Sequence, residues 1–471
     1  MINRFNNLTS KEWLPFQKSW FRYTDDETLY RENIRFFIKF DDPEKSANLF
    51  FYGDDNQIKI IKKLQKELKF KLLLRSDLER IDDLQFAIID LRTFIPKNSD
   101  LDSYLKKKKE ILDISYFIKD KLQYRRFLSV FSYNLYNSDN YYPIAWDLAK
   151  TLSSTYSLKD EKIACLSTDN GKNNSDYFST SENTFYSLYL RSDEKSNNER
   201  NYIDFPLFSN NKQKKKQNLF KENFQSWFIL KPKPRKKNEV LHPAKYPEEL
   251  TRMFIKTFTK VNDNVFDPMS GTGSTQLSAL QQNRNAYGTE LSEFFADISN
   301  QRCSEYIENN SSKLEYKILN KDARNITKKD FPKIDYIITS PPYWDMLNMK
   351  GAENQAKRIK KGLQTNYSDN NDDLGNVADY KEFLNELTNI YYNLIDLMKS
   401  GSYITIVVKN IKKKGSNYPF AWDLTQKLQK KLILLPEVFW LQDDISIAPY
   451  GYFNTYVSNT FHQYCLTFQK P

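Results

Sequence analysis

Cysteine, histidine and glycine are all scarce in this chain of 471 residues. Three cysteines, Cys165, Cys303 and Cys465, stand far apart, and only two histidines are present, so we expect neither a disulfide framework nor a Cys/His metal site. No stretch approaches the ~18–20 uninterrupted apolar residues of a membrane span. The first residues, MINRFNNLTSKEW, also lack the apolar core of a signal peptide. These absences predict a cytoplasmic, globular protein with no metal and no membrane contact.

Glycine is unevenly distributed as well as rare. The chain has 11 glycines, whereas average usage is about 7% of residues. Gly53 and Gly171 lie before residue 240, and the other nine follow it. Because tight turns and a close approach of backbone to ligand need glycine, we expect the ligand-binding chemistry in the C-terminal half.

Positive charge exceeds negative charge, with 71 Lys and Arg against 60 Asp and Glu, a net charge of +11. Such a surplus favours a polyanionic partner, since each phosphate contact releases counterions. Charge alone does not identify the partner, because many basic proteins bind nothing acidic.

Short sequence blocks recur in the same order in the two halves. Residues 142–148 (YPIAWDL) and 418–424 (YPFAWDL) agree at six of seven positions. Three further pairs are SWF at 19–21 and 226–228, FFIKF at 36–40 with MFIKTF at 253–258, and FAIIDLRTF at 86–94 with DYIITSPPY at 335–343. We infer a duplication, with copies at 1–205 and 223–471 and a linker at 206–222. Polar tracts within 166–221 predict loops.

A nucleotide-type pocket is predicted around residues 264–275 (NVFDPMSGTGST), which indicate a buried strand, a glycine turn and the start of a helix. Gly271 and Gly273 let the backbone pass close to a ligand, and a helix start suits a carboxylate. Glu290 stands at the expected end of the next strand, where an acid can hydrogen-bond both hydroxyls of a ribose. Asp322 ends a third strand, where its carboxylate can accept a hydrogen bond from an adenine amino group. Glu290 alone would ordinarily be a solvated acid at a strand end.

The sharpest signal is the run Ser340-Pro341-Pro342-Tyr343-Trp344, directly after the apolar strand 334–338. Two prolines remove backbone donors and fix φ, which leaves rigid carbonyl acceptors beside a flat aromatic ring. An exocyclic amine on a base is a poor nucleophile, because its lone pair is delocalised into the ring. The Ser340 hydroxyl and the Pro341 carbonyl can accept hydrogen bonds from the two N–H groups of the amine and so direct its lone pair at an electrophile. Tyr343 can stack on the flipped base.

At these residues the sequence resembles the prokaryotic amino-group DNA methyltransferases, specific for N4 of cytosine or N6 of adenine. The resemblance covers about residues 220–471. It implies an α/β, class I S-adenosylmethionine-dependent methyltransferase fold with a Rossmann-like doubly wound sheet, preceded by a degenerate copy. It implies these cofactor-binding residues: Asp267, Pro268, Ser270, Gly271, Thr272, Gly273, Ser274, Glu290, Asp322, and His242 with Pro243 from a segment that closes over the methionine end. The catalytic residues are Ser340, Pro341, Pro342 and Tyr343. Met269 departs from the family's usual phenylalanine.

The resemblance also implies double-stranded DNA as substrate, in restriction–modification or phage defence, with a cognate restriction endonuclease as a further partner and the nucleoid as the working location. Motif order places a target-recognition insert at 345–380. Its predicted DNA contacts are Arg358, Lys360 and Lys361, together with Trp344 beside the catalytic loop.

The first copy lacks the essentials, because it has Asp90-Leu91-Arg92-Thr93 where the second has the prolines. We expect it to scaffold the catalytic copy and to help hold DNA, with Lys106–Lys109 and residues 231–237 contacting the backbone. Its removal is expected to weaken DNA binding and to leave cofactor affinity intact.

Serine at the first catalytic position favours N4 of cytosine. The alternatives are an N6-adenine enzyme, an RNA or protein-amide methyltransferase, and a non-catalytic DNA-binding protein. Methylation at cytosine carbon 5 is disfavoured, because no cysteine follows a proline.

Overall fold

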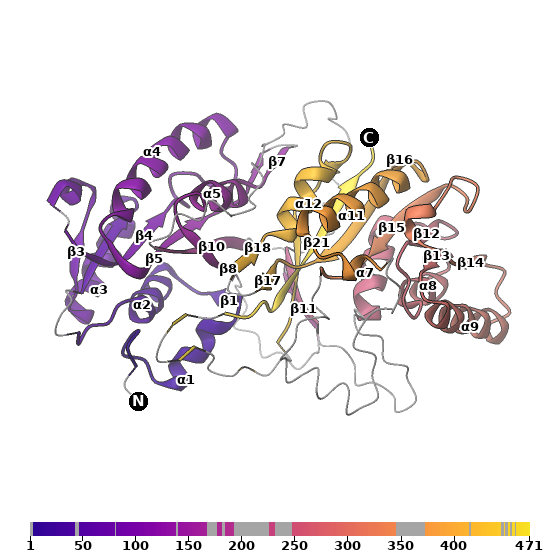
Figure 1. The fold of residues 1–471 in the computed structure, drawn as a ribbon, viewed down its shortest axis with the longest axis horizontal. Helices are drawn as coiled ribbons and strands as arrows, with labels where there is room; N and C mark the ends of the chain where they lie inside the picture. The colour runs from indigo at the N-terminus through magenta and orange to yellow at the C-terminus, as the bar shows by residue number, and fades with distance from the viewer. Residues whose placement is uncertain are drawn as a thin grey trace.

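Two sheets, one in each half of the chain, form the framework of the protein (Figure 1). The computed structural model describes residues 3–42, 47–80, 82–137, 140–166, 177–180, 184–192, 226–230, 247–344, 373–413, 416–443, 447, 451–452, 455–456 and 458–471. The N-terminus lies in the first half and the C-terminus in the second.

The first sheet has seven strands in the order β1-β8-β10-β5-β4-β2-β3. Its strands are β1 (Trp20–Tyr23), β2 (Asn48–Tyr52), β3 (Lys71–Leu73), β4 (Leu84–Asp90), β5 (Leu122–Ser132), β8 (Ser157–Leu166) and β10 (Thr184–Arg191). The helices of this half are α1 (Ser10–Trp13), α2 (Asp26–Phe37), α3 (Asp55–Leu68), α4 (Leu101–Lys119) and α5 (Ile144–Leu152), and β6 (Leu135–Asn137) pairs with β7 (Asn140–Tyr142) in a hairpin.

The second sheet has ten strands in the order β14-β13-β12-β15-β16-β21-β20-β11-β9, with β19 also on β21. They are β9 (Tyr177–Thr180), β11 (Trp227–Leu230), β12 (Asn264–Asp267), β13 (Asn285–Glu290), β14 (Tyr316–Asn320), β15 (Ile334–Thr339), β16 (Met398–Val408), β19 (Ile433–Leu434), β20 (Val438–Leu441) and β21 (His462–Gln469). The helices are α7 (Glu248–Phe258), α8 (Ser274–Leu280), α9 (Glu293–Asn309), α11 (Tyr380–Ile395) and α12 (Phe420–Leu428), and β17 (Ile411–Lys413) pairs with β18 (Ser416–Tyr418).

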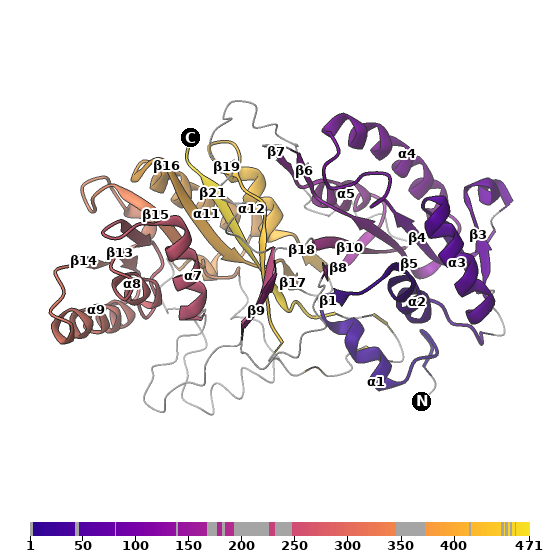
Figure 2. The same cartoon turned by 180° about the vertical axis from the view of Figure 1, so that it is seen from behind.

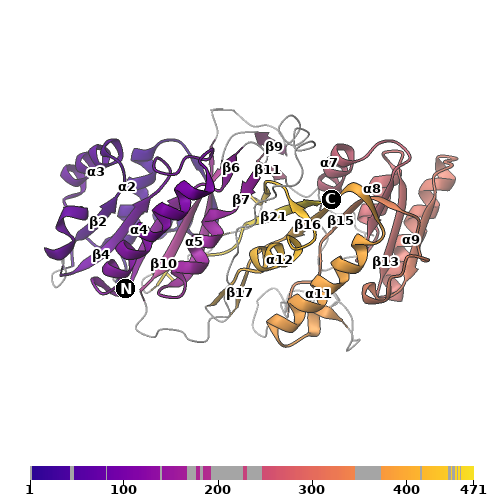
Figure 3. The ribbon, with the colours of Figure 1, turned by 90° about the horizontal axis from the view of Figure 1, so that it is seen from above.

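The sequences of the central strands explain their position in the sheets. All seven residues of β4 (LQFAIID) are buried, and five of the six in β15 (IDYIIT) are buried. Continuous apolar runs of this kind suit parallel strands that are covered on both faces. Figure 3 shows the covering, with α4 and α5 on one face of the first sheet and α11 and α12 on the matching face of the second.

The two halves repeat one topology, which confirms the predicted doubly wound fold and its degenerate copy. In each half the first strand runs parallel to the next-to-last one, β1 on β8 and β11 on β20. The last strand of each half is antiparallel to both of its neighbours, β10 between β5 and β8, and β21 between β16 and β20. Among the described residues the first half has no counterpart of β14, so its sheet is one strand shorter at that edge.

One strand corrects the prediction that the polar tract at 168–183 is all loop. Tyr177–Thr180 form β9, which pairs antiparallel with β11 and therefore joins the sheet of the second half. Seen from behind, β9 lies at the centre of the molecule, where the halves meet (Figure 2). The reason is tertiary, because an edge strand offers unpaired backbone groups to any extended segment that reaches it.

The repeated YPxAWDL blocks meet each other at the junction between the halves. Trp146 and Trp422 stack with ring centroids 5.9 Å apart and an interplanar angle of 15°, and both are fully buried. Lys150 of the first half donates to the buried carboxylate of Asp423 in the second. Farther along, Tyr456 lies in the aromatic core of the first half, beside Phe36 and other rings. The two halves therefore share one hydrophobic core.

Two equivalent glutamates, Glu161 and Glu437, lie at this junction, and each accepts hydrogen bonds from the other half. Their equivalence follows from the strand pairing, because Trp20 pairs with Ile163 and Trp227 pairs with Phe439, two residues beyond each glutamate. Glu437 accepts hydrogen bonds from Asn134 Nδ2 at 3.0 Å and Tyr186 Oη at 2.9 Å. Glu161 accepts from Asn410 Nδ2 at 2.6 Å and Tyr464 Oη at 2.8 Å. Each half is thus held by a carboxylate of the other.

Glu437 predicts a pH dependence of stability. Burial raises the pKa of its carboxyl from the ordinary 4.5 to about 7, so the folded state binds this proton more tightly than the unfolded chain. The resulting stabilisation is complete below about pH 4.5 and is lost as the pH rises to about 7. Glu437→Gln should remove about 3 kcal/mol of this pH dependence, measured by urea unfolding between pH 4.5 and 8. Parallel pH profiles for the two proteins would contradict the assignment.

Membrane-spanning helices and metal-binding clusters are absent from the described ranges. No helix there is long and apolar enough to cross a bilayer, and no group of three His, Cys, Asp or Glu side chains is placed to hold a metal ion. The three cysteines are free and buried.

Candidate active site

The site lies at the carboxyl ends of four parallel strands of the second sheet. β12 pairs with β13 and with β15, and β13 pairs with β14, all in parallel register. Strands in parallel register end at the same edge of the sheet, where ligands of open α/β sheets bind. The structure therefore brings Asp267, Glu290, Asp322 and Ser340 to one edge, although they are spread over more than seventy residues of sequence.

The glycine turn after β12 needs its glycines for conformation and for space. Gly271 has φ +54° and Gly273 has φ +76°, both in the left-handed region. A Cβ added to Gly273 would lie 2.2 Å from Ser299 Oγ and 3.1 Å from Ser299 Cα on α9. The turn is therefore packed against the next helix, and only glycine fits between them.

The polar residues of this turn fasten the loop. Asp267, 1% exposed, accepts from the Met269 amide at 3.0 Å and from Thr275 Oγ1 at 2.7 Å. Ser270 Oγ accepts from Gln276 Nε2 at 2.8 Å. The Ser274 hydroxyl is buried and has no hydrogen-bond partner among the described residues, which leaves one polar group at the turn available to a ligand.

The remaining turn residues are held by their backbone carbonyls. Pro268 O accepts from Thr289 Oγ1 at 2.7 Å, and Thr272 O accepts from Arg302 Nη1 at 2.6 Å. Thr272 is 6% exposed. These contacts fix the path of the loop from both of its sides.

Glu290, at the end of β13, contacts the turn directly. Its carboxylate accepts from the Gly271 amide at 2.7 Å and from the Ser292 amide at 3.0 Å. Burial raises the pKa of Glu290, while the two amide donors lower it, and the charges of Asp267 and Asp373 raise it further. Each carboxylate oxygen can accept a second hydrogen bond, so the acid can hold the turn and a pair of hydroxyls together.

Asp322 is more engaged than its sequence position suggested. Its carboxylate accepts from the Arg324 amide at 2.8 Å, from Arg324 Nε at 2.9 Å and from Arg324 Nη2 at 2.6 Å. Arg324 in turn pairs with Glu386 on α11 at 3.1 Å. This ion pair fixes the carboxylate at the sheet edge, and any contact with an adenine must use its remaining acceptor capacity.

The Ser340–Trp344 loop leaves the end of β15 with its aromatic residues facing different surroundings. Tyr343 donates from Oη to Gln463 Oε1 at 3.2 Å, and the Lys409 ammonium lies 5.3 Å from the centre of its ring. Ser340, Pro342 and Tyr343 are partly exposed, whereas Pro341 is buried. The loop thus presents a hydroxyl and an aromatic ring at the sheet edge.

Trp344 differs from the prediction that it contacts DNA. It is 5% exposed and packs edge-on against Tyr380 and Tyr418, with the Lys413 ammonium 3.8 Å above its ring. A ring covered on these sides anchors the loop and has no open face for a base. The aromatic residue left for stacking is Tyr343.

Three residues of the site were not predicted from the sequence. Asp373, 5% exposed, lies near enough to Glu290 to raise its pKa, although it stands in a polar tract that predicted a recognition loop. Lys409, the residue directly after β16, and Gln463 of β21 contact Tyr343. A lysine directly after the apolar strand SYITIVV was the one available signal, because burial of a cation at a strand end is unusual. Burial lowers the pKa of Lys409.

Several predicted residues lie outside the described residues: His242 and Pro243 of the predicted cofactor lid, Arg358, Lys360 and Lys361 of the predicted recognition insert, the linker at 206–222 and the basic segment at 231–237.

The first half has a closed counterpart of the catalytic loop. Ile89 pairs with Val130 and Thr339 pairs with Ile406, four residues before Asn134 and Asn410 respectively. These two asparagines are equivalent, because each accepts from the amide of the alanine in its YPxAWDL block at 2.9 Å. Asp90 therefore corresponds to Ser340.

The acceptors of Asp90 are fully used. Its carboxylate, 0% exposed, accepts from Tyr30 Oη at 2.7 Å and from Arg92 Nη2 at 2.5 Å, and the Arg92 guanidinium lies 4.4 Å from the centre of the Phe185 ring. A buried ion pair in this place cannot receive a base.

Comparisons with known proteins agree with this arrangement. The model of a family described as DNA methylase matches residues 6–301. The orphan methyltransferase M.BamHII of Bacillus amyloliquefaciens is 39% identical over 100 residues, 20% of this chain and 37% of that protein. The type II methyltransferase M.BglII of Bacillus subtilis is 34% identical over 86 residues, 18% of this chain and 24% of that protein. The matches thus span well under half of these relatives.

The similarity of this chain to solved structures is low. A methyltransferase of Streptococcus mutans in complex with SAH covers 48% of this chain and 99% of its own, with 12% identity and a TM-score of 0.28. An rRNA methylase of Clostridium thermocellum covers 49% of this chain and 100% of its own, with 14% identity and a TM-score of 0.31.

The fold and the loops at its sheet edge define a doubly wound α/β protein with a candidate ligand site at the carboxyl ends of its parallel strands. Since the family match covers more than half of the chain, the protein belongs to the DNA methylase family.

Proposed function

We propose that this protein transfers the methyl group of S-adenosylmethionine to an exocyclic amino nitrogen in double-stranded DNA, at N4 of cytosine. The observation that carries the proposal is the position of the Ser340–Tyr343 loop, which ends the strand next to the one that leads into the glycine turn. An acceptor-rich loop and a nucleotide-type turn on neighbouring strands can hold a base and a methyl donor side by side.

The residues present fit this cofactor. Gly271 and Gly273 keep the turn open to a close ligand, and the buried Ser274 hydroxyl offers a polar contact. Glu290 would hold the ribose hydroxyls and Asp322 the adenine amino group. Bound there, S-adenosylmethionine supplies an electrophilic methyl group.

The base is prepared by the protein's own groups. The Ser340 hydroxyl and the Pro341 carbonyl accept hydrogen bonds from the two N–H groups of the amine. These hydrogen bonds localise the lone pair on nitrogen. Tyr343 stacks on the flipped base, and its hydrogen bond to Gln463 keeps the ring in place. On methylation the amine would release one proton to solvent along these hydrogen bonds, with S-adenosylhomocysteine as the second product; no covalent enzyme intermediate is needed.

The domain roles form part of the proposal. Residues 223–471 carry the catalysis, and residues 1–205 scaffold them and contribute to DNA binding. Of the four consecutive lysines at 106–109 on α4, Lys107 and Lys108 pair with Glu110 and Asp147, whereas Lys106 and Lys109 are exposed and suit phosphate contacts. We propose further a role in restriction–modification, since relatives are named type II methyltransferases, with a cognate restriction endonuclease as partner.

Transfer of a tritiated methyl group to unmethylated genomic DNA tests the proposal, with Ser340→Ala beside the wild type. We expect the wild type to form N4-methylcytosine, identified by mass spectrometry of the nucleosides. Ser340→Ala should lose about 10²–10³-fold in kcat with unchanged cofactor affinity, because it removes one acceptor and leaves the turn intact.

Ser400→Ala is the matched control, since this exposed hydroxyl contacts only the C-terminal carbonyl at 2.8 Å in the described structure. N6-methyladenine as product would overturn the assignment of the base and keep the mechanism. Labelled RNA or protein with unlabelled DNA would overturn the substrate class.

A further inference from the structure

The aromatic residue of the catalytic loop is positioned by two side chains from the strands beside it. Tyr343 donates to Gln463, which lies in β21 between His462 and Tyr464, and Lys409 lies over its ring, immediately before Asn410. Successive residues of a strand point to opposite faces. Gln463 therefore faces the loop while its two neighbours face the junction with the first half.

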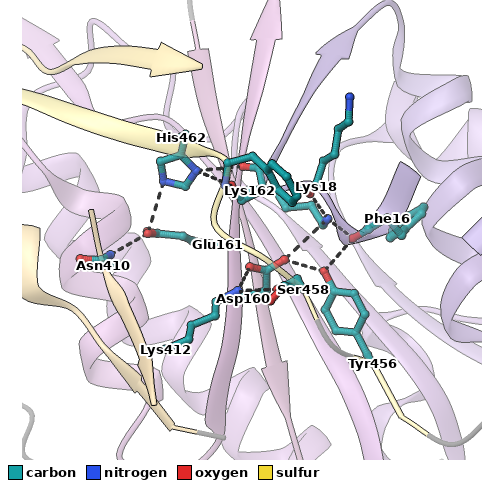
Figure 4. A network of polar contacts seen from close by, with 12 residues as sticks. Phe16, Lys18, Asp160, Glu161, Lys162, Asn410, Lys412, Tyr456, Ser458 and His462 are labelled. Atoms are coloured by element: carbon teal, nitrogen blue, oxygen red, sulfur yellow. Dashed lines mark hydrogen bonds and ion pairs between the residues drawn. The ribbon is translucent and has the colours of Figure 1, made fainter. Parts of the chain in front are cut away.

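Residues of the first half contact the sequence neighbours of both Gln463 and Lys409. Figure 4 shows these contacts for His462, next to Gln463, and for Asn410, next to Lys409. Glu161 accepts from Asn410 and from Tyr464, and its Oε1 lies 3.5 Å from His462 Nε2. On the other side of the imidazole, His462 Nδ1 lies 2.8 Å from Ser19 Oγ, which accepts from the Phe461 amide at 2.7 Å.

The contacts are buried, so they transmit position firmly. Glu161 is 2% exposed, Asn410 is 3% exposed and His462 is 0% exposed. Removing one partner from a buried hydrogen bond leaves the other unsatisfied, at a cost of about 1–3 kcal/mol. Side chains in such a close-packed junction shift together.

The duplicated half provides an internal comparison. Tyr186 pairs with Ser132 and Tyr464 pairs with Val408, so the positions of Lys409 and Gln463 correspond to Tyr133 and Phe185. In the first half these two rings pack against each other at 6.0 Å, and Phe185 lies over Arg92 of the closed loop. The polar pair is therefore found only beside the loop that has a catalytic sequence.

We infer that Glu161 of the first half is a positioning residue for Tyr343, so that the active site is completed across the two halves. Glu161 accepts hydrogen bonds from Asn410 and Tyr464, which directly follow Lys409 and Gln463 in the sequence, and these last two side chains contact the Tyr343 ring. The inference rests on the proposed function of the loop.

Glu161→Gln and Glu437→Gln form a matched pair that tests it. Both remove one buried carboxylate at equivalent positions, but Glu437 holds Asn134 and Tyr186, which lead to the closed loop. The amide in Glu161→Gln carries a single acceptor oxygen, so either Asn410 loses its acceptor or the Tyr464 hydroxyl must turn from donor to acceptor. We expect kcat to fall about tenfold in Glu161→Gln, with unchanged Kd for S-adenosylmethionine, and to stay at the wild-type value in Glu437→Gln.

Hydrogen exchange followed by mass spectrometry gives a readout independent of activity. Exchange at residues 340–344 should rise in Glu161→Gln and stay unchanged in Glu437→Gln. Equal changes in both variants, or none in Glu161→Gln, overturn the inference. If Glu161→Gln does not fold, Ser19→Ala serves, because it removes the hydroxyl that holds His462 and Phe461. If the wild type does not methylate DNA and the exchange at 340–344 still rises only in Glu161→Gln, the proposed function is refuted and the positioning role of Glu161 stands.

Discussion

Gly273→Val abolishes binding of S-adenosylmethionine in our expectation. Residue 273 has φ +76°, a conformation that costs a residue with a side chain about 1–2 kcal/mol. Its Cβ would also lie 3.1 Å from the backbone Cα of Ser299, so a rotation of the serine side chain cannot relieve the clash. The turn must move away from α9, and the Gly271 amide then loses its place against Glu290.

Isothermal titration with the cofactor measures this loss, and thermal unfolding shows whether the variant remains folded. Gly401→Val is the matched control, because Gly401 has φ +77° at the remote end of the sheet. The control should lose stability and keep its cofactor affinity. Binding by Gly273→Val within a few-fold of the wild type would mean that the turn is not the cofactor site.

Deletion of residues 1–205 should leave a chain that does not fold. The sequence suggested a milder outcome, with cofactor affinity intact, but the structure places Trp422 against Trp146 and Asp423 against Lys150 inside a shared core. Removing one partner of a buried ion pair costs about 3–5 kcal/mol, and the exposed aromatic surface adds to this loss. Such a sum consumes much of the stability of an ordinary domain.

Circular dichroism and sedimentation of residues 206–471 test this, with co-expression of residues 1–205 as the control. We expect the fragment alone to aggregate and the two pieces together to give a soluble complex with restored methyl transfer. Cooperative unfolding of the fragment alone near the melting temperature of the whole chain would contradict the shared core.

Much of the site could be predicted because its elements are continuous in sequence. The strand, glycine turn and helix around Gly271 stand within about a dozen residues, and the two prolines after a buried strand are a local signal of a rigid loop. The family resemblance carried by these motifs is confirmed by the match to DNA methylases. The duplication was readable for the same reason, since YPxAWDL is repeated almost letter for letter.

Contacts between distant elements could not be predicted. Tyr380 and Tyr418 cover the ring of Trp344. Arg324 donates to the carboxylate of Asp322 and also forms an ion pair with Glu386 on α11. Pairing of β9 with β11 likewise depends on which edge the segment reaches. Sequence spacing gives no information about such neighbours.

By itself, the sequence determined the type of fold, the order of the motifs and the chemical groups offered to a base and a cofactor, because backbone conformation and side-chain chemistry are local properties. Only the tertiary structure decided which half supports the other. Glu161 and Glu437 stand 276 positions apart, and their surroundings differ, because the contacts of Glu161 lie beside the Ser340–Trp344 loop and those of Glu437 lie in the half that holds the Asp90–Arg92 ion pair. That difference arises from packing across the junction, where buried polar groups must find partners from the other half.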